Sequence, residues 1–201
     1  MENFYNLNDH WVLILYQDSY VAENFFSVYE KVFTALTKEP CDLVAAICSN
    51  PASEKANAIP HQPYQWNGSA FYNNPNNTKV MCGLPVVASS ISSGTFYKTE
   101  VVINLGGFRE DYFIDFVDHE FHLKLLTKGW VMLWEQKANI EHNLGLQQHN
   151  AVDNWIEHSP YRYYYIARNM ANGLFCYGGF KGLYTFLKSI PGHLLKVFRY
   201  S

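Results

Sequence analysis

The sequence predicts one α/β domain with a mixed sheet flanked by helices. Strands are expected at 11–15 and 42–48, because both are short apolar runs rich in strand formers. Between them, apolar residues recur every three or four positions from Ala22 to Lys38, the pattern of an amphipathic helix that Pro40 ends. A chain of 201 residues with 48% hydrophobic content is long enough for one such core and too short to argue for two.

Downstream of the second strand, the order of elements stays that of an α/β domain. Segment 50–79 is rich in Asn, Pro and Ser with little periodicity, so we expect a long irregular loop. A short helix is predicted at 98–105, where Gly106-Gly107 would end it. A central helix then ends at Lys128-Gly129, and a strand is expected at 130–134.

The C-terminal part combines aromatic and basic residues. We assign residues 1–172 to the α/β domain and 173–201 to an amphipathic tail of the same domain. No apolar run in the tail reaches the roughly 20 residues that a membrane-spanning helix needs, and Pro191-Gly192 is expected to break it. Such a tail can lie in the membrane interface or pack on the domain or a partner chain, and both interpretations stay open. The polar stretch 147–158 before it is expected to be mobile.

Three carboxylates crowd the start of the central helix. Asp115, Asp118 and Glu120 precede apolar residues at helical spacing. Unpaired backbone N–H groups and the helix dipole stabilise negative charge at such a position. Carboxylates held there suit a general base or a metal-facing anion. Ordinary N-capping is the alternative that the spacing leaves open.

Charge and cysteine content limit the function classes. A net charge of −3 and a pI near 6.2 provide no basic surface for nucleic acid, so nucleic-acid binding is not expected. The four cysteines lack C-x-x-C spacing, and no signal peptide precedes them. We therefore expect reduced thiols in a cytoplasmic protein. The sequence also lacks the G-x-S-x-G elbow and the H-E-x-x-H helix of common hydrolases.

A set of linked motifs resembles a known enzyme family. The run SSISSGTFYKTEVVINLGGFREDYFIDFVDHEFHLKLLTKGW, followed by IEHNLG and then RYYYIARN, is similar to the second half of family-2 glycosyltransferases, especially bacterial rhamnosyltransferase-like members. The likeness covers about 84–172 and keeps the order of the motifs. It implies a truncated GT-A fold and inverting transfer of a sugar, with rhamnose suggested, from a nucleoside-diphosphate sugar. The implied acceptor is a hydroxyl of a glycan or lipid-linked glycan in cell-surface polysaccharide synthesis, on the inner face of the cell membrane.

The resemblance implies roles for individual residues. Asp118 takes the position of the catalytic base that deprotonates the acceptor hydroxyl. Glu120 would orient the acceptor, and Asp115 belongs to the same acidic group. Ser93 and Gly94 match the family's S-G element, which lies beside the donor sugar.

Metal and phosphate groups are expected at other positions. The first strand ends in YQDS, where the resembling family has an Asp-x-Asp-type motif, so that Asp18 keeps the second acid and Tyr16 replaces the first. His142 matches an H-x-x-G frame that completes the family's metal site. With Asp18, it is expected to hold a divalent cation, Mn²⁺ or Mg²⁺, together with diphosphate oxygens and water. Arg162 and Arg168 could neutralise a diphosphate or lipid-linked phosphate, or form a solvated helix edge.

Two departures from the family pattern leave a second function open. The phenol of Tyr16 supplies no negative charge at neutral pH. The nucleotide-binding strands that family members carry before this motif do not precede it here, so a partner chain or a longer gene product would have to supply them. The alternative to an active transferase is a catalytically silent remnant that binds sugar or completes a partner subunit.

Overall fold

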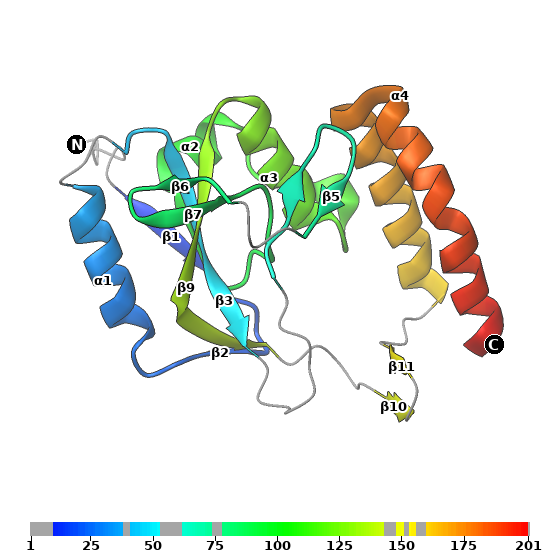
Figure 1. The fold of residues 1–201 in the computed structure, drawn as a ribbon, viewed down its shortest axis with the longest axis horizontal. Helices are drawn as coiled ribbons and strands as arrows, with labels where there is room; N and C mark the ends of the chain where they lie inside the picture. Colours follow the sequence, from blue (N-terminus) through cyan, green and yellow to red (C-terminus); the bar gives the residue numbers. More distant parts are fainter. Residues whose placement is uncertain are drawn as a thin grey trace, which may run out of the picture.

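The protein is a mixed α/β structure, described by a computed structural model. The described residues are 10–37, 41–52, 62–73, 78–142, 148–150, 153–155 and 160–200. In these parts a mixed sheet lies at the centre, with α1 on one side and α2 and α3 on the other, while α4 lies at the far end of the long axis from α1 (Figure 1). The predicted class, a mixed sheet flanked by helices, is confirmed.

The main sheet of the described residues has seven strands. Their order is β1-β8-β3-β9-β7-β6, and β2 pairs with β9 beside this path. The β3–β9 pair is parallel, whereas β1–β8, β3–β8 and β7–β9 are antiparallel. The bounds are β1 Trp11–Ile14, β2 Ser19–Val21, β3 Val44–Ala52, β6 Val80–Met81, β7 Leu84–Val87, β8 Thr95–Lys98 and β9 Val131–His142. Two small hairpins lie apart from it: β4 Gln65–Trp66 with β5 Phe71–Tyr72, and β10 Gln148–Asn150 with β11 Asp153–Trp155.

Helices cover both faces of the sheet because each buries an apolar stripe. The bounds are α1 Phe25–Leu36, α2 Thr99–Asn104, α3 Val117–Thr127 and α4 Pro160–Tyr200, with a short 3-10 turn, η2, at Glu110–Tyr112. On one face, Phe25 and Tyr29 of α1 pack against Ile47 of β3 in one core cluster. On the other face, Phe121 of α3 and Ala46 of β3 share a second cluster. The alternation of a strand's side chains across the sheet therefore supplies both cores.

The strands and helices predicted up to residue 134 are present, with local differences. The strand at 11–14 lies at the end of the described strand order and is only partly buried, rather than buried as its apolar run suggested. The irregular loop predicted at 50–79 is wrong for its start, where β3 continues to Ala52, and for its middle, where the β4–β5 hairpin forms. Residues 53–61 and 74–77 lie outside the described residues. Most of the stretch predicted to be mobile, 147–158, also lies outside them.

The tail forms the second arm of a helical hairpin. The break predicted at Pro191-Gly192 is wrong, because α4 continues through Pro191 and turns instead at Gly179, whose φ of 57° is unfavourable for other residues. After the turn, Gly182 is so close to the first arm that a Cβ there would overlap the Leu174 carbonyl. The predicted boundary at residue 173 falls inside the first arm. Among the described helices, none combines the length and apolar character needed to cross a bilayer, as predicted for the tail.

The cysteines differ from the expectation of four reduced thiols. Cys41, before β3, is joined to Cys82, in the turn between β6 and β7, by a disulfide. The expectation is wrong for this pair, since the distance between two positions in the fold cannot be derived from their spacing in the sequence. Cys48 is a buried free thiol in β3 and Cys176 is an exposed free thiol in α4.

Candidate functional site

The candidate site centres on Asp118, in the first turn of α3. The Tyr16 hydroxyl, from the loop after β1, donates to both carboxylate oxygens of Asp118, at 3.0 Å to Oδ1 and 2.9 Å to Oδ2. Partial burial and the neighbouring charge of Asp118 raise the pKa of Tyr16 above its ordinary value, so the hydroxyl keeps its proton and remains the donor. The structure thus places the residue that replaces the first acid of the YQDS frame directly on the predicted catalytic base.

Ser93 and Gly94 hold the loop that carries Tyr16. The Ser93 hydroxyl accepts the Tyr16 backbone N–H at 3.0 Å and lies 2.7 Å from the Ser19 hydroxyl. Gly94 has a φ of 76°, and a Cβ there would overlap the Ser49 hydroxyl, so the position requires glycine. Both residues are fully buried behind the loop. Their predicted contact with a donor sugar stays a prediction.

Asp18 and the backbone of His142 lie at the same edge of the sheet. Asp18 directly precedes β2, and Ser19, the next residue, pairs with His142 in the antiparallel β2–β9 register. This pairing brings together two residues predicted to share a cation; the side chain of His142 lies outside the described parts. Among the described side chains, no group of three or more His, Cys, Asp or Glu residues is arranged to hold a metal. The predicted pair would therefore depend on phosphate oxygens and water for its other ligands.

A buried chain of hydrogen bonds lies close to Asp118. It runs through Ser92, Tyr97, His122, Ser89 and His119. The backbone N–H of Ser90 points at Nδ1 of His122, so this nitrogen accepts and Nε2–H donates to the Tyr97 hydroxyl at 2.6 Å. Burial lowers the pKa of His122 to about 3, which keeps the imidazole neutral. Sequence reasoning missed this chain, although the i, i+3 spacing of His119 and His122 at the predicted base was an available signal.

The turn before α3 has an unusual backbone. Phe113, Asp115 and Phe116 have φ values of 59°, 61° and 62°, a region that residues other than glycine rarely occupy. Asp115 therefore lies in this turn rather than in the helix, and Arg162 of α4 binds its carboxylate with two hydrogen bonds of 2.8 and 3.0 Å. Gly173 of α4 provides space for the Phe116 ring, which a Cβ at that position would overlap. Strained turns of this kind persist only where the surroundings hold them.

Asn169 of α4 holds the same turn through hydrogen bonds to its backbone. Its buried side-chain amide donates to the backbone carbonyls of Tyr112, Ile114 and Asp115, at 2.8, 2.8 and 2.9 Å. Arg168 donates to the Asn169 side-chain oxygen at 2.8 Å and also to a backbone carbonyl of the 3-10 turn. Both predicted phosphate-binding arginines thus have partners within the protein, and their role toward a ligand stays a prediction.

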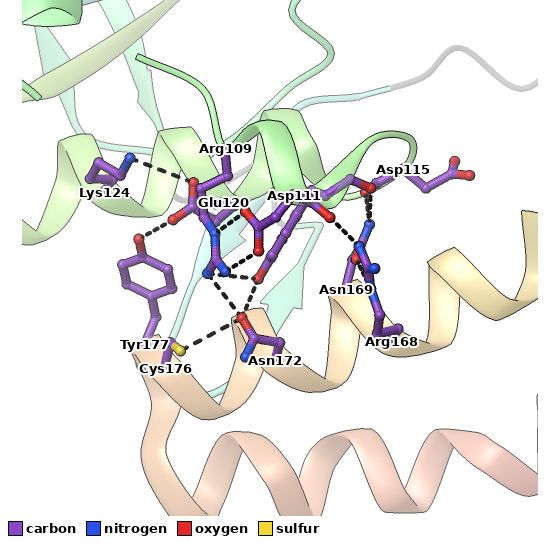
Figure 2. Close-up of polar contacts among 11 residues, drawn as sticks. Arg109, Asp111, Asp115, Glu120, Lys124, Arg168, Asn169, Asn172, Cys176 and Tyr177 are labelled. Carbon is purple, nitrogen blue, oxygen red and sulfur yellow. Dashed lines mark hydrogen bonds and ion pairs between the residues drawn. The ribbon is translucent and has the colours of Figure 1, made fainter. Parts of the chain in front are cut away.

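Glu120 lies in the joint between α3 and α4 (Figure 2). It is two residues after Asp118, which places it on the other side of the helix. Its carboxylate is 2% exposed, accepts the Tyr177 hydroxyl at 2.6 Å and lies 3.9 Å from the Lys124 ammonium. Burial and the Glu120 charge raise the pKa of Tyr177, so the phenol stays a donor. The structure does not bring Glu120 together with Asp118, and its predicted contact with the acceptor stays a prediction.

Asn172 completes this joint as an acceptor. Its side-chain oxygen accepts the Tyr112 hydroxyl at 2.7 Å and a guanidinium N–H of Arg109 at 3.0 Å. The thiol of Cys176 is one helical turn further along α4, with its sulfur 3.8 Å from the same oxygen. As Figure 2 shows, side chains from the first arm of α4 point toward segment 109–120 and fix its position.

Comparisons of the chain with protein-family models, with curated proteins and with solved structures found no match. The candidate site is therefore described from its geometry alone. The predicted site residues fall into two groups. One group lies at the end of β1 and contains Asp118, Tyr16, Ser93 and Asp18; the other lies at the contact between segment 109–120 and α4 and contains Asp115, Glu120, Arg162 and Arg168.

Proposed function

We propose that this chain is a glycosyltransferase module of the family-2 type, with a fold of the GT-A kind. It transfers a sugar, with rhamnose the first to test, from a nucleoside diphosphate to a hydroxyl of a glycan or lipid-linked glycan, with inversion. One observation carries the proposal: both carboxylate oxygens of Asp118 receive a hydrogen bond from a hydroxyl group. That is the contact a general base makes with the acceptor hydroxyl before it takes the proton.

In this mechanism the acceptor hydroxyl replaces the phenol of Tyr16. Asp118 binds the acceptor O–H and takes its proton as the oxygen attacks the anomeric carbon of the donor sugar, while the bond from that carbon to the diphosphate breaks. Asp18 and His142 are the residues that would hold a Mn²⁺ or Mg²⁺ ion. A bound cation of this kind neutralises charge on a leaving diphosphate.

We place the reaction in the cytoplasm, at the inner face of the cell membrane, where a lipid-linked acceptor would be presented; the Cys41–Cys82 disulfide is uncommon for that compartment. The proposed function rests on the likeness of the motifs over 84–172 and on the position of Asp118.

The decisive test compares Asp118→Asn with the matched carboxylate change Asp42→Asn, which alters an exposed turn residue before β3. We expect Asp118→Asn to lower turnover at least about 100-fold, the size of a general-base contribution, without loss of folded structure by circular dichroism. Asp42→Asn should leave turnover unchanged. Substantial turnover by Asp118→Asn would refute the assigned role.

Donor binding is tested separately. Calorimetric titration with UDP and with dTDP, with and without Mn²⁺, should show metal-dependent binding that Asp18→Ala removes. Binding that is independent of the metal and unchanged in Asp18→Ala would contradict the assigned cation site.

A second candidate is a catalytically silent subunit that binds sugar or completes a partner chain. Two observations favour it: the phenol of Tyr16 engages Asp118, and β1 is at the end of the described strand order, where a partner could add a strand. This candidate predicts nucleotide or glycan binding without turnover in the wild-type protein. Recovery of turnover when a second polypeptide is added would then show that the module is half of an enzyme.

A further inference from the structure

Charge is divided unevenly along the chain. Residues 1–159 carry all 18 acidic residues and nine of the 15 lysines and arginines, a net charge of −9. Residues 160–201 carry the other six basic residues and no acidic residue, a net charge of +6. The acidic overall pI therefore conceals a basic helical hairpin, which is α4.

The second arm of α4 exposes large apolar side chains on one face. Phe180, Tyr184 and Leu187 are 84%, 59% and 51% exposed and recur at helical spacing, so they form one stripe. Lys181 and Lys188, both exposed, each follow a stripe residue by one position and lie along its edge. The Lys188 ammonium lies 4.6 Å from the centre of the Tyr184 ring. We call this set the basic aromatic stripe.

The stripe faces away from the sheet, and its residue Phe180 contacts Phe175 of the first arm, with 5.9 Å between ring centres. Gly182, on the opposite side of the same helix, is buried against Leu174 of the first arm. Figure 1 shows the second arm, coloured orange to red, on the far side of the first arm from the sheet. In the described part of the chain, the two core clusters therefore do not include these apolar side chains.

We propose that the basic aromatic stripe docks on the surface of a bilayer that contains anionic lipid. Aromatic and leucine side chains enter the boundary between headgroups and acyl chains, while lysines beside them bind lipid phosphates. Charge complementarity selects this partner over a dimer in which two stripes meet, because two stripes of the same positive charge repel. Nucleic acid would satisfy the lysines but leave Phe180 and Leu187 exposed to water.

The inference is independent of the proposed transfer reaction, and its test measures binding alone. The full chain is sedimented with vesicles of phosphatidylcholine, and with vesicles that also contain phosphatidylglycerol. The double variant Phe180→Ser with Leu187→Ser removes the apolar contacts, and Lys181→Gln with Lys188→Gln removes the charges. Matched controls are Ile103→Ser, an exposed apolar residue on α2, and Lys128→Gln with Lys137→Gln, two exposed lysines elsewhere.

We expect binding to the anionic vesicles that high salt weakens. The lysine pair should contribute roughly 25-fold in affinity, since each basic residue near an anionic surface contributes about 5-fold. The serine pair should lower affinity at least about 10-fold, and the controls should match the wild type. No binding to anionic vesicles, equal binding by the stripe variants and controls, or a dimer by light scattering that only the serine pair dissociates would each overturn the proposal.

Discussion

At the scale of single residues, the contact between Tyr16 and Asp118 decides how the candidate site can work. The phenol already makes the hydrogen bonds that an acceptor hydroxyl would make, so a substrate must displace it. Because Tyr16 lies in a loop held by Ser93 rather than in a strand, the displacement requires a change of side-chain or loop conformation and leaves the sheet intact.

The strength of that contact can be measured without a substrate. In a double-mutant cycle of Tyr16→Phe and Asp118→Ala, we expect a coupling of about 1 kcal/mol in the free energy of unfolding. The value is modest because both groups are partly exposed, so water replaces the lost bond. Urea denaturation of the four proteins gives the coupling. Strictly additive effects would show that the bond contributes nothing to folding.

His122 should make stability depend on pH. Burial lowers its pKa from 6.5 to about 3, so between these values the unfolded chain binds a proton that the folded chain does not. The free energy of unfolding should therefore fall as the pH falls from about 6.5 toward 3, by up to roughly 1.4 kcal/mol per unit from this group, and should not change through His122 above that window. Thermal unfolding from pH 7 to pH 4 should show a shallower slope for His122→Gln, while the exposed His10→Gln keeps the wild-type slope. Equal slopes in all three proteins would contradict the assignment.

At the scale of elements, the turn at 113–116 depends on α4 for its shape. Its left-handed residues are not glycines, and the side chains that stabilise them come from a helix much later in the chain. Two asparagines of that helix have opposite roles: Asn169 donates its amide to carbonyls, whereas Asn172 accepts through its oxygen.

The same substitution should therefore have opposite outcomes at these two positions. Asn169→Asp puts a buried carboxylate against three backbone carbonyls, which we expect to lower the free energy of unfolding by about 3 kcal/mol or more. Asn172→Asp keeps the acceptor and adds charge beside Arg109, so its effect should stay within about 0.5 kcal/mol. Urea unfolding of both variants is the measurement, and similar losses at the two positions would rule out the donor role of Asn169.

Sequence reasoning was most successful where the structure is set by local pattern. The strands predicted at 11–15 and 42–48 and the helices predicted at 22–38 and 98–105 are present as β1, β3, α1 and α2, as is the central helix, because apolar runs, apolar periodicity and Pro or Gly at helix ends are local signals. The turn at 113–116 could not be predicted, because the residues that support its backbone are distant in sequence. The helical hairpin was missed although Gly178-Gly179 is a turn signal, because Pro191 was taken as the natural break.

At the scale of the whole molecule, the sequence predicted which residues belong to the candidate site but not how those residues are arranged in space. Motif likeness selected Asp118, Asp18 and Ser93, and the fold brings their segments to one end of β1. It also selected Glu120 and Arg168, which the fold places in the joint with α4. Contacts between distant segments, such as Tyr16 with Asp118, depend on how the sheet and α3 are assembled, which a single sequence does not encode locally.

The states of the four cysteines also allow the natural protein to be labelled at a single site. All four lie in described parts of the chain: Cys41 and Cys82 are joined, and burial raises the pKa of Cys48 to about 12, which leaves little reactive thiolate. Cys176 is exposed and adjoins Asn172 in the joint between α3 and α4. A maleimide dye should therefore attach once to the unmodified, unreduced protein, with the adduct counted by mass spectrometry. Its fluorescence would then follow the opening and closing of that joint without any engineered label.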